Sequence, residues 1–213
     1  MAAAPVKLVC FDLGRVLIRI CDNWRHACEI AGVAAPTREL DDDAKLKLHE
    51  LVCRSECGAI ELDAFASEAS TLFGMAARHV VALSNAYLIA PFSGVRELID
   101  EINSCDIRTA CLSNTNASHW SMMTDASHRA GLPLDRLTYR FASHLIRARK
   151  PDDAIYAHVE RETKLRPEQI LFFDDLAENV DAASRRGWRV HRVVACDDPV
   201  TQMRDVLRSV HVL

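Results

Sequence analysis

Short apolar segments and amphipathic segments alternate along most of the chain. Runs rich in β-branched and aromatic residues predict five strands, at Lys7–Phe11, Arg108–Leu112, Leu137–Phe141, Gln169–Phe173 and Arg189–Val194. Apolar residues at helical spacing predict helices between them, at Val95–Ile102, Asp153–Thr163 and Ala177–Arg186. This alternation predicts an α/β fold in which helices flank a parallel sheet on both faces.

The segment from about Arg19 to Ala90 has a different pattern. It contains no convincing strand, and its apolar residues recur at helical spacing, as at Leu48, Leu51 and Val52. Glycines such as Gly58 and Gly74 mark turns or helix ends. We therefore predict a small helical domain of residues 19–90, inserted after the first strand. Residues 1–18 and 91–213 are predicted to form the core domain.

Composition narrows the classes of function. About half of the 213 residues are apolar (49%), enough for a sizeable core. The net charge of −4 argues against binding nucleic acid through bulk charge, and no polybasic run suggests a membrane surface. Residues 1–10 lack the long apolar segment of a signal peptide, and no stretch has the length of a membrane span.

The eight cysteines show no CxxC pairing. They predict reduced, buried thiols in a cytoplasmic protein. The sequence gives no indication of the oligomeric state.

Reactive residues follow four of these elements. Asp12 ends the first strand, Ser113-Asn114-Thr115-Asn116 follows the second, and Asp174-Asp175 follows the fourth. Lys150-Pro151 comes after the third strand and before a helix. Ligands of an open parallel sheet gather beyond the carboxyl ends of its strands. Three carboxylates imply Mg²⁺, and a hydroxyl, an amide-rich turn and a lysine imply a phosphoryl group.

Each of these elements also has a simpler interpretation. Asp12 alone could be a cap or turn residue, Ser113-Asn114 could begin a helix, and Asp174-Asp175 could cap the helix near Ala177. Lys150 could be a solvated lysine. The combination is far more specific than any single member.

In their order along the chain, these segments resemble the four motifs of the haloacid dehalogenase-like hydrolase superfamily. The matching segments are Phe11-Asp12-Leu13-Gly14-Arg15-Val16-Leu17, Leu112-Ser113-Asn114-Thr115, Arg149-Lys150-Pro151-Asp152 and Phe172-Phe173-Asp174-Asp175-Leu176-Ala177-Glu178-Asn179. The chain looks similar to the phosphatase branch with a small helical cap, and within it to bacterial sugar-phosphate phosphatases of the α-glucose-1-phosphatase type. The resemblance implies a Rossmann-like core with the cap inserted.

The resemblance also implies roles. Asp12 would be the nucleophile that forms an aspartyl-phosphate. Mg²⁺ would be held by Asp12, the backbone carbonyl of Gly14, and Asp174, with Asp175 acting through a water. Ser113 and the backbone N–H of Asn114 would bind the phosphoryl oxygens, and Lys150 would neutralise charge on the phosphate and on Asp12. Asn179 would orient the loop or metal waters, or else lie on the helix surface.

Three positions depart from the family pattern. Gly14 stands where most phosphatases of the superfamily carry a second aspartate, the general acid and base. Arg15 replaces a smaller residue and could add phosphate affinity or obstruct the entrance. Arg147 replaces a glycine common in relatives; with Arg149 and Lys150 it could strengthen anion binding, although a solvated basic face is favoured.

Three hypotheses about function follow. The leading one is a Mg²⁺-dependent phosphatase acting on a small phosphorylated metabolite, such as a sugar phosphate. The second, motivated by Gly14 and Arg15, is a protein that binds Mg²⁺ and a phosphorylated ligand with little turnover, as a sensor or interaction partner. The third is a metal-independent 2-haloacid dehalogenase, which the adjacent Asp174 and Asp175 disfavour.

Overall fold

The strand that leads into Asp12 lies at the centre of a parallel sheet. The computed structural model describes residues 4–36, 39–194 and 198–213. Its five-stranded sheet has the order β5-β4-β1-β6-β7, with bounds β1 Leu8–Phe11, β4 Arg108–Ser113, β5 Tyr139–Ala142, β6 Ile170–Asp174 and β7 Arg189–Arg192. All neighbouring strands in it are parallel. The predicted fold class and all five predicted strands are confirmed.

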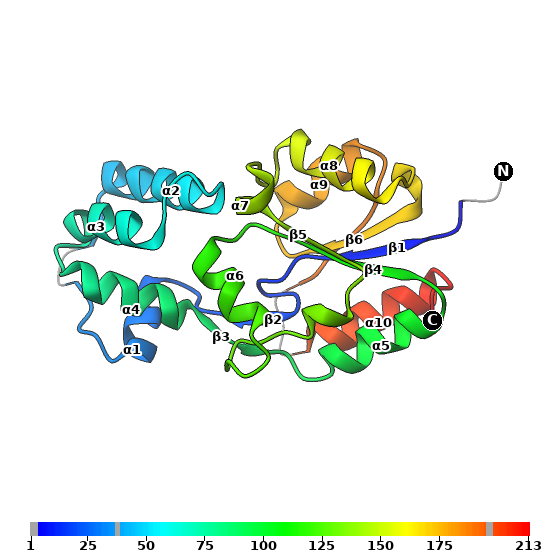
Figure 1. Ribbon diagram of the computed structural model, residues 1–213, viewed down its shortest axis with the longest axis horizontal. Helices are drawn as coiled ribbons and strands as arrows, with labels where there is room; N and C mark the ends of the chain where they lie inside the picture. Colours follow the sequence, from blue (N-terminus) through cyan, green and yellow to red (C-terminus); the bar gives the residue numbers. More distant parts are fainter. Residues whose placement is uncertain (1–3, 37–38, 195–197) are drawn as a thin grey trace.

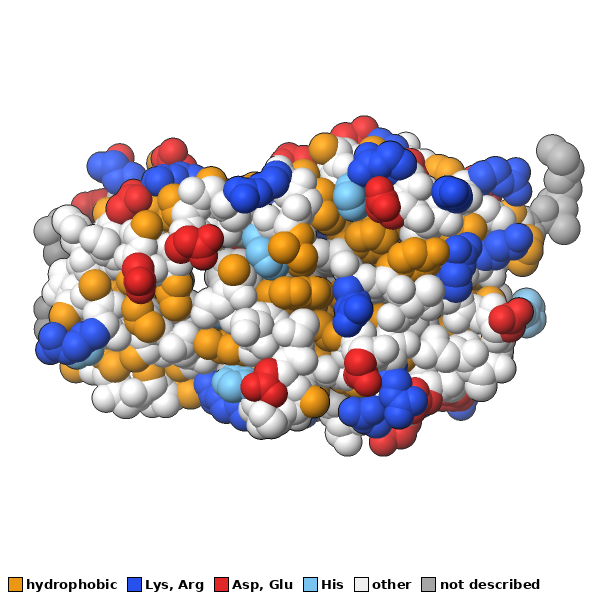
Figure 2. All heavy atoms as spheres, viewed as in Figure 1, with side chains coloured by type: hydrophobic (Ala, Val, Ile, Leu, Met, Phe, Trp, Pro, Cys, Tyr) orange, Lys and Arg blue, Asp and Glu red, His pale blue; other side chains and the backbone are white. Residues whose placement is uncertain are grey.

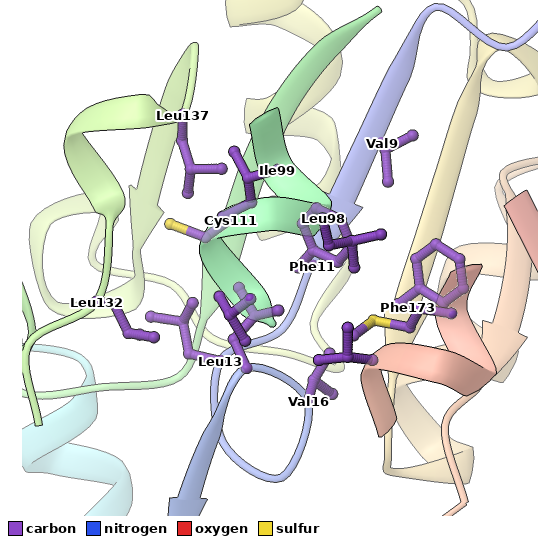
Figure 3. Packing of buried hydrophobic residues seen from close by; sticks show 14 of the residues in the cluster. Val9, Phe11, Leu13, Val16, Leu98, Ile99, Cys111, Leu132, Leu137 and Phe173 are labelled. Carbon is purple, nitrogen blue, oxygen red and sulfur yellow. The ribbon is translucent and has the colours of Figure 1, made fainter. Parts of the chain in front are cut away.

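Both faces of the sheet are buried. Alternate residues of each strand point to opposite faces, so the residues of β1 belong to two apolar clusters. Val9 and Phe11 belong to one apolar cluster, together with residues of α-helices that include Leu98 and Ile99 (Figure 3). Leu8 and Cys10 belong to a second cluster on the other face. Phe11 stacks on Phe173 of β6, with ring centroids 5.6 Å apart. A strand buried on both faces explains why its sequence is an unbroken apolar run.

Helices cover the two faces, as Figure 1 shows. Helices α5 and α10 lie below the sheet in that view, and α8 and α9 lie above it. The bounds are α5 Val95–Ser104, α6 Ala117–Thr124, α7 Ser143–Ile146, α8 Asp153–Thr163, α9 Ala177–Arg185 and α10 Pro199–Ser209, with short 3₁₀ turns at Leu134–Arg136 and Pro167–Gln169. The three predicted helices correspond to α5, α8 and α9.

Four helices form a separate layer beside this core (Figure 1). They are α1 Trp24–Ala31, α2 Asp42–Glu56, α3 Leu62–Phe73 and α4 Ala77–Tyr87. Most of their buried residues form apolar clusters of their own, which include Leu48, Phe65 and Val80. We refer to α1–α4 and the loops between them as the insert.

The expectation that residues 19–90 contain no strand is wrong at both ends of that segment. Strands β2 Ile18–Ile20 and β3 Leu88–Pro91 pair antiparallel and join the insert to the core. Each has only three or four residues, too few for strand periodicity to stand out. They are held by pairing with a segment distant in the sequence rather than by local propensity.

The described cysteines are free thiols, and Cys10, Cys21, Cys28 and Cys111 are buried as expected. Cys105 is exposed, so the expectation of burial is wrong there; it lies just after α5, where the chain turns at the surface. Cys196 lies outside the described residues.

Acidic and basic side chains are interspersed over the face that Figure 2 shows. Every helix within residues 4–36, 39–194 and 198–213 is too short or too polar to span a lipid bilayer.

Candidate active site

Three strands bring the predicted residues to one edge of the sheet. Asp12 directly follows β1, Ser113 ends β4 and Asp174 ends β6. The N–H of Asp12 donates to the carbonyl of Phe173 at 2.8 Å, which extends the β1–β6 pairing to the end of both strands. Since parallel strands share their carboxyl edge, residues far apart in the sequence meet here. The interpretation of Asp12 as an ordinary turn residue does not fit this position.

Lys150 lies between two carboxylates inside this edge. Its Nζ is 2.8 Å from Oδ1 of Asp12 and 2.7 Å from Oδ2 of Asp174. Only 1% of its side chain is exposed, so the interpretation as a solvated lysine is wrong. Burial alone would lower the pKa of Lys150, but Asp12 and Asp174 outweigh that effect and raise it. Lys150 is therefore a buried, fixed positive charge.

Burial has the opposite consequence for Asp12. It raises the pKa of the Asp12 carboxyl group above the usual range. The ammonium of Lys150 opposes this rise, and the carboxylate of Asp174 adds to it. Positive charge close to Asp12 therefore favours the ionised form of its carboxyl group.

Two asparagines position the charged groups. The side chain of Asn114 accepts from the N–H of Lys150 at 2.8 Å and donates to its carbonyl at 2.9 Å. It therefore fixes the backbone of Lys150. Asn179 is 2% exposed, and its Nδ2 donates to both oxygens of Asp174, at 3.0 and 3.1 Å. A position on the helix surface is therefore excluded for Asn179, and its hydrogen bonds orient Asp174.

The acidic residues fit a hard cation. Asp12, Asp174 and Asp175 each offer a carboxylate oxygen, and these oxygens lie within 4.8 Å of one another. The Oδ1 of Asn179 is buried beside them and has no hydrogen-bond partner among the described residues. Clustered oxygen donors of this kind suit Mg²⁺. The structure thus brings together the three acidic side chains that the sequence predicted as metal ligands.

The loop after β1 carries two of the three departures from the family pattern, Gly14 and Arg15. A Cβ at Gly14 would meet the side chain of Ile20 at 3.4 Å, and the backbone there is not left-handed. Arg15 is left-handed, with φ 57°. Its guanidinium is 3.4 Å from the carbonyl of Cys21 and 3.9 Å from Oδ2 of Asp175. Arg15 therefore points into the site and lies beside an expected metal ligand.

A cavity of about 330 Å³ opens in front of these groups. Its walls include Asp12, Ser113 and Asn114 from the core, and Glu56 and Tyr87 from the insert. Core and insert thus enclose one space together.

Contacts across this boundary hold the insert against the core. The carboxylate of Glu56 is 2.9 Å from Nη2 of Arg149, and its carbonyl accepts from the Ser143 hydroxyl at 2.6 Å. Arg147 donates to the carbonyl of Gly58. The favoured interpretation of Arg147, Arg149 and Lys150 as a solvated basic face is wrong. Only Arg147 is exposed, because the chain turns between these residues and points them in different directions.

Sequence reasoning named no residue of the insert as part of the site and so missed Glu56. One signal was available: Glu56 is the last residue of α2. A carboxylate is unfavourable at the negative end of a helix unless a cation is near.

The family model for haloacid dehalogenase-like hydrolases matches residues 45–193, more than half of the chain. The chain belongs to this family. The match confirms the resemblance carried by the four motifs. Members of the haloacid dehalogenase-like family are also found among solved structures of the same fold.

A HAD family enzyme of Bacteroides thetaiotaomicron, bt-2542, has a TM-score of 0.80 and 20% identity, covering 94% of this chain and 99% of that one. The same enzyme in complex with magnesium and inorganic phosphate has a TM-score of 0.76 and 21% identity, covering 93% and 100%. A predicted HAD-like family hydrolase of Porphyromonas gingivalis has a TM-score of 0.74 and 25% identity, covering 96% and 99%. L-2-haloacid dehalogenase of Xanthobacter autotrophicus has a TM-score of 0.63 and 22% identity, covering 88% and 77%.

Proposed function

We propose that this protein is a Mg²⁺-dependent phosphoric monoester hydrolase that forms an aspartyl-phosphate on Asp12. One observation carries the proposal: the carboxylate of Asp12 is 2.8 Å from a fully buried lysine and belongs to a cluster of three carboxylates. That arrangement suits a nucleophile that must meet an anionic substrate. The magnesium and phosphate bound to the Bacteroides enzyme support it. The substrate would be a small phosphorylated metabolite, such as a sugar phosphate.

In the first step, a carboxylate oxygen of Asp12 attacks phosphorus, and the bond between phosphorus and the leaving alcohol oxygen breaks with its electron pair; that oxygen takes up a proton from solvent. Water then attacks the phosphorus of the aspartyl-phosphate and gives up a proton to solvent, which releases inorganic phosphate and restores the carboxylate. Asp12, Asp174 and the backbone carbonyl of Gly14 would hold Mg²⁺, with Asp175 through a water, and the ion would reduce repulsion between nucleophile and phosphate.

Two other groups would act on the phosphoryl oxygens. Lys150 would stabilise the charge that builds up on them, from a position that Asn114 fixes. Ser113, which lines the cavity at the end of β4, would hydrogen-bond to them, as would the backbone N–H of Asn114.

The decisive experiment measures phosphate release from a panel of phosphomonoesters that includes glucose 1-phosphate, with Mg²⁺ and with EDTA. We expect turnover that requires Mg²⁺ and disappears in Asp12→Asn. Asp106→Asn is the matched control, because Asp106 is exposed and precedes β4, whereas Ser113 of the site lies at the other end of that strand. Metal-dependent turnover that survives in Asp12→Asn would refute the aspartyl-phosphate route. Halide release from 2-haloacids without Mg²⁺ would instead favour a dehalogenase.

Gly14 favours a second candidate, a protein that binds Mg²⁺ and a phosphorylated ligand with little turnover. An acid–base residue typically contributes about 10²–10⁴-fold to rate, and glycine has no such group. Gly14→Asp separates the candidates, because its Cβ would only touch Ile20. For a slow hydrolase we expect Gly14→Asp to raise kcat by about 10²-fold or more. A ligand-binding protein would show thermal stabilisation by ligand and no turnover in either form.

A further inference from the structure

Arg15 is the feature of this site that the proposed function leaves unused. We infer that Arg15 determines specificity by binding a second anionic group on the leaving part of the substrate. The substrates would then be phosphomonoesters whose alcohol carries a carboxylate or another anionic group. This inference rests on the proposed function and narrows the class of substrate.

The first argument is the pairing of the cavity's cations. Lys150 is 2.7 and 2.8 Å from its two carboxylates, and Arg149 is 2.9 Å from that of Glu56. Arg15 also lines the cavity, but its contact with the carboxylate of Asp175 is 3.9 Å long. A guanidinium has five N–H donors in a planar fork that suits carboxylates and phosphates. Of the three cations, Arg15 is therefore the one best able to accept a new anion.

The second argument concerns Asp175, the partner of Arg15. Asp175 belongs to the carboxylate cluster that would hold Mg²⁺. A divalent ion there would draw the negative charge of Asp175 to itself. The charge on Arg15 would then be compensated even less, which favours an anionic ligand when the cation is bound.

The third argument is location. Arg15 donates to the carbonyl of Cys21, at the base of the insert. It also lies close enough to Tyr87 at the end of α4 to oppose the rise that burial causes in the pKa of Tyr87. The phosphoryl group would sit between Asp12, Ser113 and Lys150 at the strand ends. The leaving part would extend toward the insert, where Arg15 and Tyr87 line the wall.

The backbone gives independent support. Arg15 has φ 57°, in the left-handed region where glycine is unstrained and most other residues are not. A strained residue at a site wall is typical of a functional side chain.

A matched pair of ligands tests the inference. 3-Phosphoglycerate and glycerol 3-phosphate are similar in size, and only the first carries a carboxylate on its alcohol. Affinities are measured by calorimetry in Asp12→Asn with Mg²⁺, so that neither ligand is consumed, and kcat/KM is measured in the protein with Asp12 intact. We expect 3-phosphoglycerate to bind about tenfold tighter or more, as a charge-assisted pair with arginine would give.

Arg15→Gln should remove this preference, with the loss in affinity and KM rather than in kcat, and Arg15→Lys should retain part of it. Arg19→Gln is the matched control; it removes the same charge from β2, where Arg19 is exposed and packs on Phe92. It should leave the preference unchanged.

The other outcomes overturn the inference in distinguishable ways. Equal affinity for the two ligands would exclude a second anionic subsite while leaving the hydrolase proposal intact. Equal weakening of both ligands in Arg15→Gln would mean that Arg15 binds the transferred phosphoryl group. Binding of neither ligand, together with no phosphate release from any phosphomonoester, would refute the proposed function and the inference with it.

Discussion

Two arginine–glutamate pairs of equal exposure behave in opposite ways. Arg149 and Glu56 join the core to the insert, whereas Arg186 and Glu160 join the end of α9 to α8 within the core. In both pairs 21% of the arginine side chain and 18% of the glutamate side chain is exposed. Yet the pKa of Glu56 is raised and the pKa of Glu160 is lowered.

Hydrogen bonding explains the difference. Burial raises the pKa of each glutamate, but Glu160 receives Arg186 on both oxygens, at 3.0 and 2.7 Å, and also the indole N–H of Trp188 at 2.8 Å. Glu56 lies deeper in the protein. Two nitrogens of Arg149, Nε and Nη2, approach the same oxygen of Glu56, at 3.0 and 2.9 Å. An ion pair with both oxygens satisfied stabilises the fold. The pair across the boundary is only partly compensated, which suits a contact that can open.

The largest effect is expected at Lys150, where solvent is excluded and one cation lies between two carboxylates. Lys150→Met leaves Asp12 and Asp174 facing each other without their shared cation. Breaking a buried pair in this way costs about 3–5 kcal/mol. Urea unfolding in EDTA should show this loss, and added Mg²⁺ should recover part of it. A loss of free energy of unfolding below about 1 kcal/mol would mean that Lys150 and its two carboxylates are solvated in solution, as in an exposed ion pair.

The next effect separates the two pairs directly. Arg186→Gln should lower the free energy of unfolding by about 2 kcal/mol, since it removes charge-assisted bonds to both oxygens of Glu160. Arg149→Gln should cost about 1 kcal/mol or less, because burial already opposes the ionised form of Glu56 with which Arg149 pairs. Chemical denaturation of both variants side by side measures this. Equal losses would contradict the distinction drawn from the hydrogen bonds.

Glu56→Gln should change the free energy of unfolding of the whole protein only a little, but it should clearly destabilise the insert. Weakening the contact with Arg149 should loosen the insert while the core sheet stays folded. Hydrogen exchange of amides in α2 and α3 should therefore accelerate, with amides of β1 and β6 unchanged. Glu160→Gln serves as the matched control, and we expect no acceleration in the insert from it. Unchanged exchange in Glu56→Gln would show that Ser143 and Arg147 hold the insert without this pair.

The smallest expected effect is in pH dependence, and its sign differs between the pairs. A lowered pKa means that Glu160 stabilises the fold above its unfolded pKa of about 4.3. That stability is lost as the pH falls through the folded pKa, so the advantage over Glu160→Gln shrinks in acid. For Glu56, with a raised pKa, stability relative to Glu56→Gln should instead increase as the pH falls from the folded pKa toward the unfolded one. Unfolding curves between about pH 3.5 and 7, a range that brackets these carboxyl groups, would test both slopes. Slopes of the same sign would contradict the assignment.

The sequence predicts the strand-end chemistry because its signals are local. Asp12 and Asp174-Asp175 follow unbroken apolar runs, and parallel strands bring their ends together. Helix α10 is not among the predicted helices, although its sequence carries local signals. Asp198 caps it, Pro199 begins it, and buried Val200 and Met203 share one face.

Other features depend on partners distant in the sequence, and no local pattern identifies those partners. The pairing of β2 with β3 joins residues about 70 positions apart in the sequence. The role of Asn179 depends on which face of α9 meets Asp174. The contact of Glu56 with Arg149 depends on how the insert lies against the core. Packing between segments that are distant in the sequence decides these features. No short stretch of the sequence indicates which segments pack together.

The β2–β3 pairing also affects how the entropy of folding the core depends on the length of the insert. Ile20 is paired with Leu88, so the two ends of the insert lie side by side. For the core, the insert is then a single closed loop between β1 and β4, which are neighbours in the sheet. The entropy of closing a flexible loop rises only by about 0.6 kcal/mol for each doubling of its length. An insert of different length on the same β2–β3 pair would therefore change the walls of the cavity. It would alter the entropy of forming the sheet that carries Asp12 only slightly.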